Sequence, residues 1–155
     1  MTKTLPPESV PDQNRTPLFD AVMDYLELDP AYFRIPGHRF ERGINKKWLD
    51  YAGSGIFRMD LTETPFFDDL HNPKAAIREA QDLAAALFGS EKSYFLVNGT
   101  TCGNQAMVLA SAGEGEEILV PRNAHKSVVG GMILSRAVPV YLKPEISPKA
   151  GVPGV

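Results

Sequence analysis

The chain has 155 residues, 43% of them hydrophobic, and a net charge of −3 at pH 7. This composition predicts a globular protein with a real core and gives no electrostatic reason to bind nucleic acid or an acidic membrane face. No apolar run approaches the roughly 20 residues that cross a bilayer, no secretory signal pattern opens the chain, and the single cysteine excludes an internal disulfide. We therefore expect a cytoplasmic protein whose partner is a small molecule or another protein chain.

Residues 1–15 are polar and contain Pro6, Pro7 and Pro11, which predicts a flexible N-terminal tail. An amphipathic helix is expected next. Thr16-Pro17 is a favourable helix start, apolar residues then recur at three-to-four spacing, and Asp29-Pro30 ends the pattern.

The stretch from Ala31 to His71 shows little periodicity and is rich in glycine, aromatic and charged residues. Ordinary connections are about 4–6 residues long, so a segment of this length predicts a functional region or one pressed against a partner. Residues 16–72 are accordingly interpreted as a helix followed by an irregular arm. Within the arm, Lys46-Lys47 beside Trp48 is interpreted as a solvated edge.

Regular structure resumes at Asn72-Pro73, which is interpreted as a helix cap and a first-turn proline. An apolar helix face continues to Phe88, and Gly89 is suited to close the helix. Three apolar runs, at 94–97, 118–120 and 138–142, then alternate with helical runs that reach Ala112 and Ser135. This alternation predicts an α/β fold with a parallel-rich sheet flanked by helices. Residues 73–155 are interpreted as the start of that domain, incomplete because a parallel sheet is normally covered on both faces.

Two polar clusters follow the first two predicted strands, where an open α/β sheet places its ligand: Asn98–Thr101 and Pro121–Ser127. Backbone N–H groups and hydroxyls at a helix start favour an anion such as a phosphate; a tight turn whose hydroxyls merely cap the helix is the alternative. The first cluster lacks the glycine spacing of nucleotide and dinucleotide loops. In the second, His125 has the chemistry to stack on a flat cofactor or to shuttle a proton, or is a surface residue.

Other reactive side chains carry weaker signals. Lys126 is more simply a surface lysine than an imine-forming one. Cys102 with His125 would suggest a thiol nucleophile, but a small, buried, inert side chain is the preferred interpretation because no cysteine signature accompanies it. No metal site is predicted, since the spacings of the candidate ligands match no standard motif; these are His38, His71, His125, Asp68 and Asp69.

Five ordered segments together resemble one family: "TPLFDAV", "RIPGHRF", "DLTETPFFDDLHNPKAAIREAQDLAAALFGS", "YFLVNGTTCGNQAMVLA" and "ILVPRNAHKSVVGGMILSRAVPVYLKPE". They are similar to the Orn/Lys/Arg decarboxylases, pyridoxal-phosphate enzymes of the aspartate aminotransferase fold (fold type I). The likeness is greatest to the shorter arginine and lysine decarboxylases of Gram-positive type. It runs from about Thr16 to the last residue, Val155, which makes it far more specific than any single motif.

The resemblance implies that residues 73–155 begin the large domain that binds pyridoxal 5'-phosphate. Gly99, Thr100 and Thr101 match the turn that holds the cofactor's phosphate, and His125 matches the histidine that lies against the pyridine ring. The family usually has serine where Thr101 stands, and a hydroxyl is retained.

The resemblance places no catalytic residue within this sequence. Lys126 belongs to the ring-stacking segment, whereas the family's imine-forming lysine and the aspartate facing the pyridine nitrogen come in later segments. We expect both of those residues to lie beyond Val155, in segments that this sequence does not contain.

The resemblance also implies the function: the N-terminal portion of a decarboxylase that converts arginine, lysine or ornithine into a polyamine-pathway amine and carbon dioxide. We expect this polypeptide to be inactive alone and the full-length enzyme to be a homodimer or higher oligomer, with residues 16–72 as an arm near the dimer interface and active site. The motif containing His38 is typical of the family, but no role is assigned to His38. Two alternatives remain: a non-catalytic paralogue or partner of a full-length decarboxylase, and a thiol or phosphate-ester hydrolase that uses Cys102 and His125.

Overall fold

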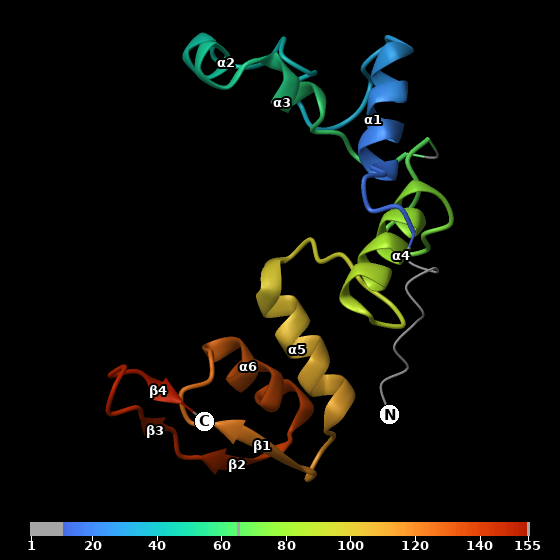
Figure 1. Ribbon diagram of the computed structural model, residues 1–155. Coiled ribbons are helices and arrows are strands. Elements are labelled where there is room, and N and C mark those ends of the chain that lie inside the picture. The colour runs from blue at the N-terminus through green and yellow to red at the C-terminus, as the bar shows by residue number, and fades with distance from the viewer. Residues whose placement is uncertain (1–10, 65, 155) are drawn as a thin grey trace. The chain divides into compact units, whose positions relative to one another are not determined.

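The computed structural model describes residues 11–64 and 66–154. The chain divides into two compact units, one ending at Phe95 and one beginning at Leu96 (Figure 1). Two predictions reach past the described residues: most of the expected flexible tail, residues 1–10, lies outside them, and so does Val155, the last residue of the expected cofactor domain.

The described part of the expected tail contacts a helix. Gln13 Nε2 donates a hydrogen bond to the carbonyl of Leu83 at 3.3 Å, and Arg15 forms an ion pair with Glu79. These contacts attach residues 11–15 to the first unit.

The first unit is built on two helices that the sequence predicts, α1 (Pro17–Glu27) and α4 (Ala76–Phe88). They pack against each other, and the buried Tyr25 of α1 lies edge-on to Phe67 with ring centroids 4.8 Å apart. Gly89 closes α4 with φ 64° and ψ 27°, the left-handed conformation expected of it.

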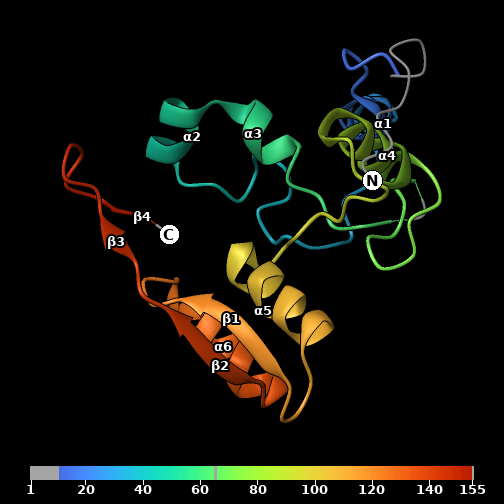
Figure 2. The same cartoon turned by 60° about the horizontal axis from the view of Figure 1, so that its bottom comes forward.

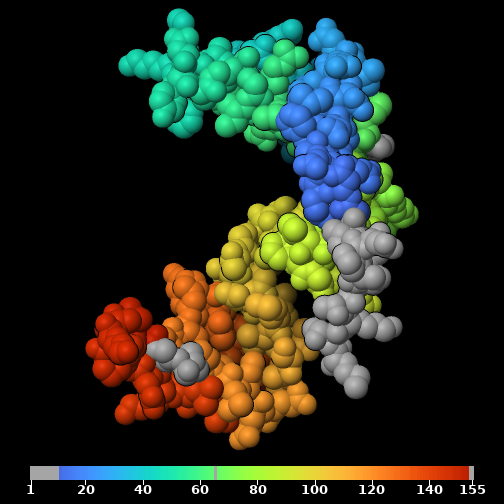
Figure 3. All heavy atoms as spheres, in the orientation of Figure 1, coloured from blue at the N-terminus to red at the C-terminus, as the bar shows by residue number. Residues whose placement is uncertain are grey.

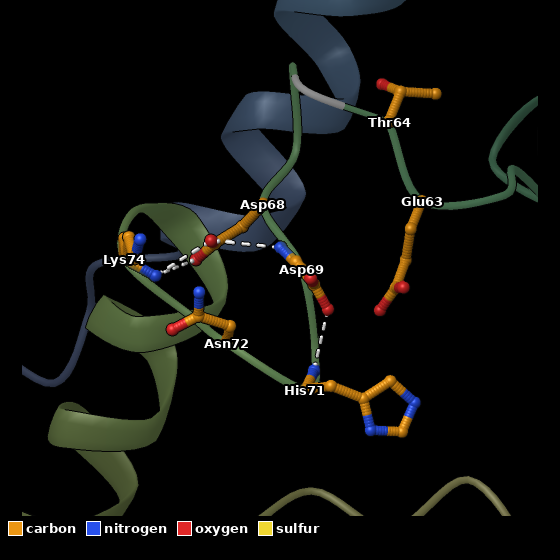
Figure 4. A pocket seen from close by; sticks show the side chains of 7 residues that line it. All are labelled: Glu63, Thr64, Asp68, Asp69, His71, Asn72 and Lys74. Atoms are coloured by element: carbon orange, nitrogen blue, oxygen red, sulfur yellow. Dashed lines mark hydrogen bonds between the residues drawn. The ribbon is translucent and has the colours of Figure 1, made fainter.

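The predicted start of α4 is wrong by three residues. Asn72-Pro73 does not cap the helix, which begins at Ala76. The carboxylate of Asp68 takes that place. It accepts a backbone N–H bond from Lys74 at 2.8 Å (Figure 4) and another from Ala75 at 2.7 Å. An acceptor eight positions ahead of the helix escapes any local capping pattern, which reads only the adjacent residues.

Asp68 also accepts N–H bonds from Asp69 at 2.9 Å and Arg78 at 3.2 Å. Burial raises the pKa of the Asp68 carboxyl, but the N–H groups that stabilise the charged form outweigh it and lower the pKa from its ordinary value of 3.8 to about 2. This carboxylate therefore fixes the connection between the irregular arm and α4.

The irregular arm contains two short helices that the sequence pattern does not show, α2 (Lys46–Ala52) and α3 (Ser54–Arg58). Asn45 caps α2, accepting the N–H of Lys47 at 3.0 Å. At seven and five residues, both helices are too short for an apolar face to recur, so periodicity misses them. Lys46 pairs with Asp50 at 2.8 Å and Trp48 is exposed, in line with a solvated edge.

The second unit is an α/β arrangement with a parallel sheet, as predicted. Strands β1 and β2 pair in parallel, Leu119 opposite Val140, and α6 connects them while packing on α5 (Figure 2). A short antiparallel pair, β3 with β4, follows. The bounds are α5 (Gly99–Ser111), β1 (Glu117–Pro121), α6 (Lys126–Ser135), β2 (Val138–Leu142), β3 (Glu145–Ile146) and β4 (Pro153–Gly154).

The strand predicted at 94–97 does not form. Tyr94 and Val97 are about three-quarters exposed, at 74% and 76%, and no described segment pairs with this run. A strand needs a neighbour for its backbone donors and acceptors, so the apolar run stays an irregular lead into α5. The sheet of β1 and β2 therefore has two strands where three were expected.

The core of the second unit joins Val108 of α5, Val120 of β1 and Met132 of α6, elements that lie packed together in the yellow-to-orange part of Figure 3. The opposite face of β1 carries Leu119, which is 67% exposed. This exposed face agrees with the expectation of a sheet with one face uncovered. Among the described residues, none of the helices combines the length and apolar character needed to span a membrane.

Candidate functional site

The first turn of α5 carries the predicted phosphate-binding residues, Gly99, Thr100 and Thr101. The first N–H groups of a helix have no acceptor inside it, and the side chain of Asn98, the residue before the helix, forms no capping hydrogen bond. Gly99 has φ 69°, a conformation that favours glycine, with open space where a Cβ would stand. Both threonines are exposed, so this turn presents donors and hydroxyls to an anion.

His125 stands immediately before α6, at the end of the turn that follows β1. Its Nδ1 accepts the backbone N–H of Ser127 at 3.2 Å, which makes the imidazole the N-cap of this helix. The residue is otherwise exposed. Since Nδ1 faces the helix, the rest of the ring is free to meet a planar ligand.

A hydrogen bond connects the beginnings of the two helices. Asn104, in the second turn of α5, donates from Nδ2 to the hydroxyl oxygen of Ser127 at 2.7 Å, and that oxygen lies 2.8 Å from Nδ1 of His125. The structure thus links the helix that bears the phosphate-turn residues to His125 within one compact unit. The sequence places Ser127 in the second polar cluster but does not indicate Asn104 or the bond between them, because residues 23 positions apart share no local pattern.

The other predicted residues lie as follows. Lys126 is an exposed residue in the first turn of α6. Cys102 is exposed, so the expectation of a buried side chain is wrong: it lies on a part of α5 that the described residues leave open. Among the described residues no hydrogen bond joins Cys102 to His125, whose Nδ1 is engaged by Ser127. The geometry gives the thiol-nucleophile alternative no support.

His38 and His71 belong to the first unit, and His125 belongs to the second. Nε2 of His38 lies 3.2 Å from a carboxylate oxygen of Asp60, and the His38 side chain is only 13% exposed. His71 borders an open pocket of about 640 Å³, where its backbone N–H binds Asp69 (Figure 4). The described parts of the chain contain no group of three or more His, Cys, Asp or Glu side chains arranged to hold a metal ion.

Comparison with known proteins gives one consistent family. The model of the Orn/Lys/Arg decarboxylase major domain matches residues 16–155. Arginine decarboxylase of Bacillus anthracis is 43% identical over 140 residues, covering 90% of this chain and 28% of that protein. Constitutive ornithine decarboxylase of Escherichia coli is 30% identical over 146 residues, covering 90% of this chain and 20% of that protein.

A solved structure agrees with these sequences. That of the constitutive lysine decarboxylase of E. coli superposes with a TM-score of 0.73 at 27% sequence identity, over 93% of this chain and 21% of that one. The chain therefore spans less than a third of the length of each of these relatives.

Proposed function

The chain belongs to the Orn/Lys/Arg decarboxylase family, and from this premise we propose that it supplies the phosphate-binding turn and the ring-facing histidine of a pyridoxal-phosphate-dependent decarboxylase. The proposed substrate is a basic amino acid, arginine, lysine or ornithine, and the products are the corresponding amine, which feeds polyamine biosynthesis, and carbon dioxide. The names of the relatives support this substrate class.

One observation carries the assignment of the site. The turn at Gly99–Thr101 and the imidazole of His125 belong to neighbouring helices of one unit that Asn104 and Ser127 connect. A phosphorylated planar ring needs both an anion-binding turn and a flat surface at a fixed distance from it. The uncapped first turn of α5 and the exposed His125 fit these two requirements.

In this proposal the residues of the chain bind and orient. The chemistry that bound pyridoxal phosphate supplies is to accept the electron pair left on the substrate when its carboxylate departs as carbon dioxide. The first-turn N–H groups of α5 and the hydroxyls of Thr100 and Thr101 hold the phosphate. His125 restrains the tilt of the ring, since its imidazole is itself anchored through Nδ1.

The catalytic residues proper are assigned to segments outside this sequence. That the imine-forming lysine and the aspartate facing the pyridine nitrogen lie beyond Val155 stays a prediction, as does the inactivity of this polypeptide on its own. The exposed position of Lys126, in the first turn of α6 and directly after His125, fits a residue of the ring-facing segment.

The proposal extends to organisation and location. Residues 16–72 act as an arm in a homodimer or higher oligomer, and residues 73–155 as the start of the cofactor domain; both boundaries stay predictions. Within the arm, the side chains of Phe33, Trp48 and Tyr51 are 96%, 68% and 93% exposed, which favours contact with another chain. A cytoplasmic location is proposed because a lone cysteine fits a reducing compartment.

The proposed site is tested with pyridoxine 5'-phosphate, which lacks the aldehyde and so forms no bonds with surface lysines, and with pyridoxine, which also lacks the phosphate. Titration calorimetry of the chain and its variants measures both affinities. We expect Thr101→Val to weaken pyridoxine 5'-phosphate about tenfold, the effect of one hydrogen bond to a charged group, and to leave pyridoxine unchanged. His125→Ala is expected to weaken both ligands, because it removes the surface under the ring.

The matched control is Ser111→Ala at the far end of α5. Among the described residues, the hydroxyl of Ser111 bonds the carbonyl of Met107 alone, at 2.7 Å. Its affinities are expected to equal those of the unmodified chain. Equal losses of both ligands in Thr101→Val would contradict the phosphate assignment, and unchanged affinities in His125→Ala would contradict the ring assignment.

A further inference from the structure

Ser127 is a buried polar residue. It is 2% exposed and stands in the first turn of α6, the helix that packs on α5. A buried hydroxyl is costly unless it is hydrogen-bonded. Both its partners are at short distances, Asn104 Nδ2 at 2.7 Å and His125 Nδ1 at 2.8 Å.

We propose that Asn104 and Ser127 are positioning residues for His125: they fix the orientation of its ring and its neutral tautomer, with the proton on Nε2. The inference rests on the proposed function for its purpose, since an anchored imidazole is useful as a platform for a planar cofactor. The hydrogen-bond chain itself is a property of this unit alone.

The direction of these hydrogen bonds follows from their donors. A backbone N–H only donates, so the Ser127 N–H at 3.2 Å requires an unprotonated Nδ1 on His125. Asn104 donates to the Ser127 oxygen, which leaves the hydroxyl proton free to be donated to Nδ1. Two donors therefore converge on Nδ1, and the proton of the neutral ring resides on Nε2.

The opposite direction is chemically distinct. If Asn104 presented its carbonyl oxygen to Ser127, the hydroxyl would donate to Asn104, and Nδ1–H of His125 would donate to the hydroxyl oxygen. Nδ1 would then carry the proton, and the N–H of Ser127 would lose its acceptor. The tautomer of His125 thus reports which arrangement holds.

The consequence is rigidity in a side chain that is otherwise exposed. An imidazole on a surface turn rotates about two side-chain bonds, and losing that freedom on ligand binding weakens the ligand. Here the rotation is restricted in advance by bonds to a buried hydroxyl and a backbone amide. The link through Asn104 further couples the ring to α5, the helix whose first turn holds the phosphate in the proposed function.

The first test needs no cofactor. The chain has three histidines, so nitrogen-15 histidine labelling gives few signals, and the His125 signals are those lost in His125→Ala. Nitrogen chemical shifts, measured at a pH where the ring is neutral, are expected to show Nε2 protonated and Nδ1 not. A protonated Nδ1 would overturn the proposal.

Variants then test whether the two residues cause this state. Ser127→Ala and Asn104→Ala are each expected to lower the ratio of Nε2-protonated to Nδ1-protonated His125 about fivefold, the effect of one ordinary hydrogen bond. Ser127→Thr, which keeps the hydroxyl, is expected to restore it, and Ser111→Ala to leave it unchanged. A tautomer ratio in both alanine variants equal to that of the unmodified chain would overturn the proposal. Thermal unfolding verifies that each variant is folded; Asn104→Ala, at a half-buried position, carries the test if Ser127→Ala unfolds.

Affinity for pyridoxine 5'-phosphate separates this inference from the proposed function. We expect a loss of about fivefold in Ser127→Ala and recovery in Ser127→Thr. If His125→Ala binds as well as the unmodified chain, the proposed role of His125 fails, while the tautomer measurement still decides the positioning claim. If His125→Ala weakens binding but Ser127→Ala does not, the positioning claim alone is overturned.

Discussion

The contact between α5 and α6 depends on a glycine, and Gly131→Ala tests it. A Cβ built at Gly131 would lie 2.8 Å from Cβ of Val108 and 3.3 Å from Cα of Gln105. Neither neighbour is the end of a flexible side chain, so the two helices must move apart. Overpacking of this kind costs about 1–3 kcal/mol, and it acts between the two helices whose first turns form the candidate site.

Gly130→Ala is the matched control. Its Cβ would meet only the end of the Gln105 side chain, at 3.0 Å from Nε2, which can rotate away. Both substitutions gain about 1 kcal/mol because alanine favours the helix more than glycine does, so this gain cancels between them. The free energy of unfolding of Gly131→Ala is therefore expected to be about 2 kcal/mol below that of Gly130→Ala.

Urea unfolding followed by circular dichroism measures this difference. Equal stabilities for the two alanine variants would refute the close approach of α5 and α6 described here.

Three further predictions concern other parts of the chain. Asp68→Ala should lower the free energy of unfolding by about 1–2 kcal/mol. Because the pKa of Asp68 is lowered from 3.8 to about 2, its contribution to stability is full above pH 4 and is lost as the pH falls toward 2. Urea unfolding at a series of pH values should find this dependence in the unmodified chain and not in the variant. Leu119→Lys, at a 67% exposed position, should change stability by less than about 0.5 kcal/mol and reduce self-association in sedimentation experiments, whereas a large loss of stability would mean that Leu119 is buried. Cys102→Ser should leave pyridoxine 5'-phosphate affinity unchanged in calorimetry, and a marked loss would revive a role for the thiol.

The sequence predicts the elements whose signals are local. The three-to-four spacing of α1 and α4 and the glycine at position 89 are such signals. Both helices form, with α4 beginning three residues later than predicted. The same is true of the βαβ rhythm of β1, α6 and β2. Each of these elements carries its own apolar face or closing residue, so a window of about a dozen residues contains the information.

What the sequence does not predict depends on distant partners. The apolar run at 94–97 has the composition of a strand, but composition cannot supply the neighbour that a strand requires. Asp68 accepts the N–H groups at the start of α4 although it lies eight positions before the helix, and Asn104 donates to Ser127, 23 positions away. The polar clusters after the predicted strands already indicate Asn98–Thr101 and His125 as candidates for ligand binding, and the family resemblance assigns them the phosphate and the ring. The bonds that hold His125 emerge only from the folded unit.

Mapping where pyridoxine 5'-phosphate binds tests the phosphate-binding role of the first turn of α5, by following backbone amide signals of the nitrogen-15-labelled chain during titration. We predict that the largest shifts occur at Gly99, Thr100 and Thr101, with further shifts around His125. Pyridoxine, which lacks the phosphate, is expected to leave the signals of Gly99, Thr100 and Thr101 unchanged. Saturable binding whose shifts lie elsewhere, or shifts at residues 99–101 of the same size with pyridoxine, would contradict it.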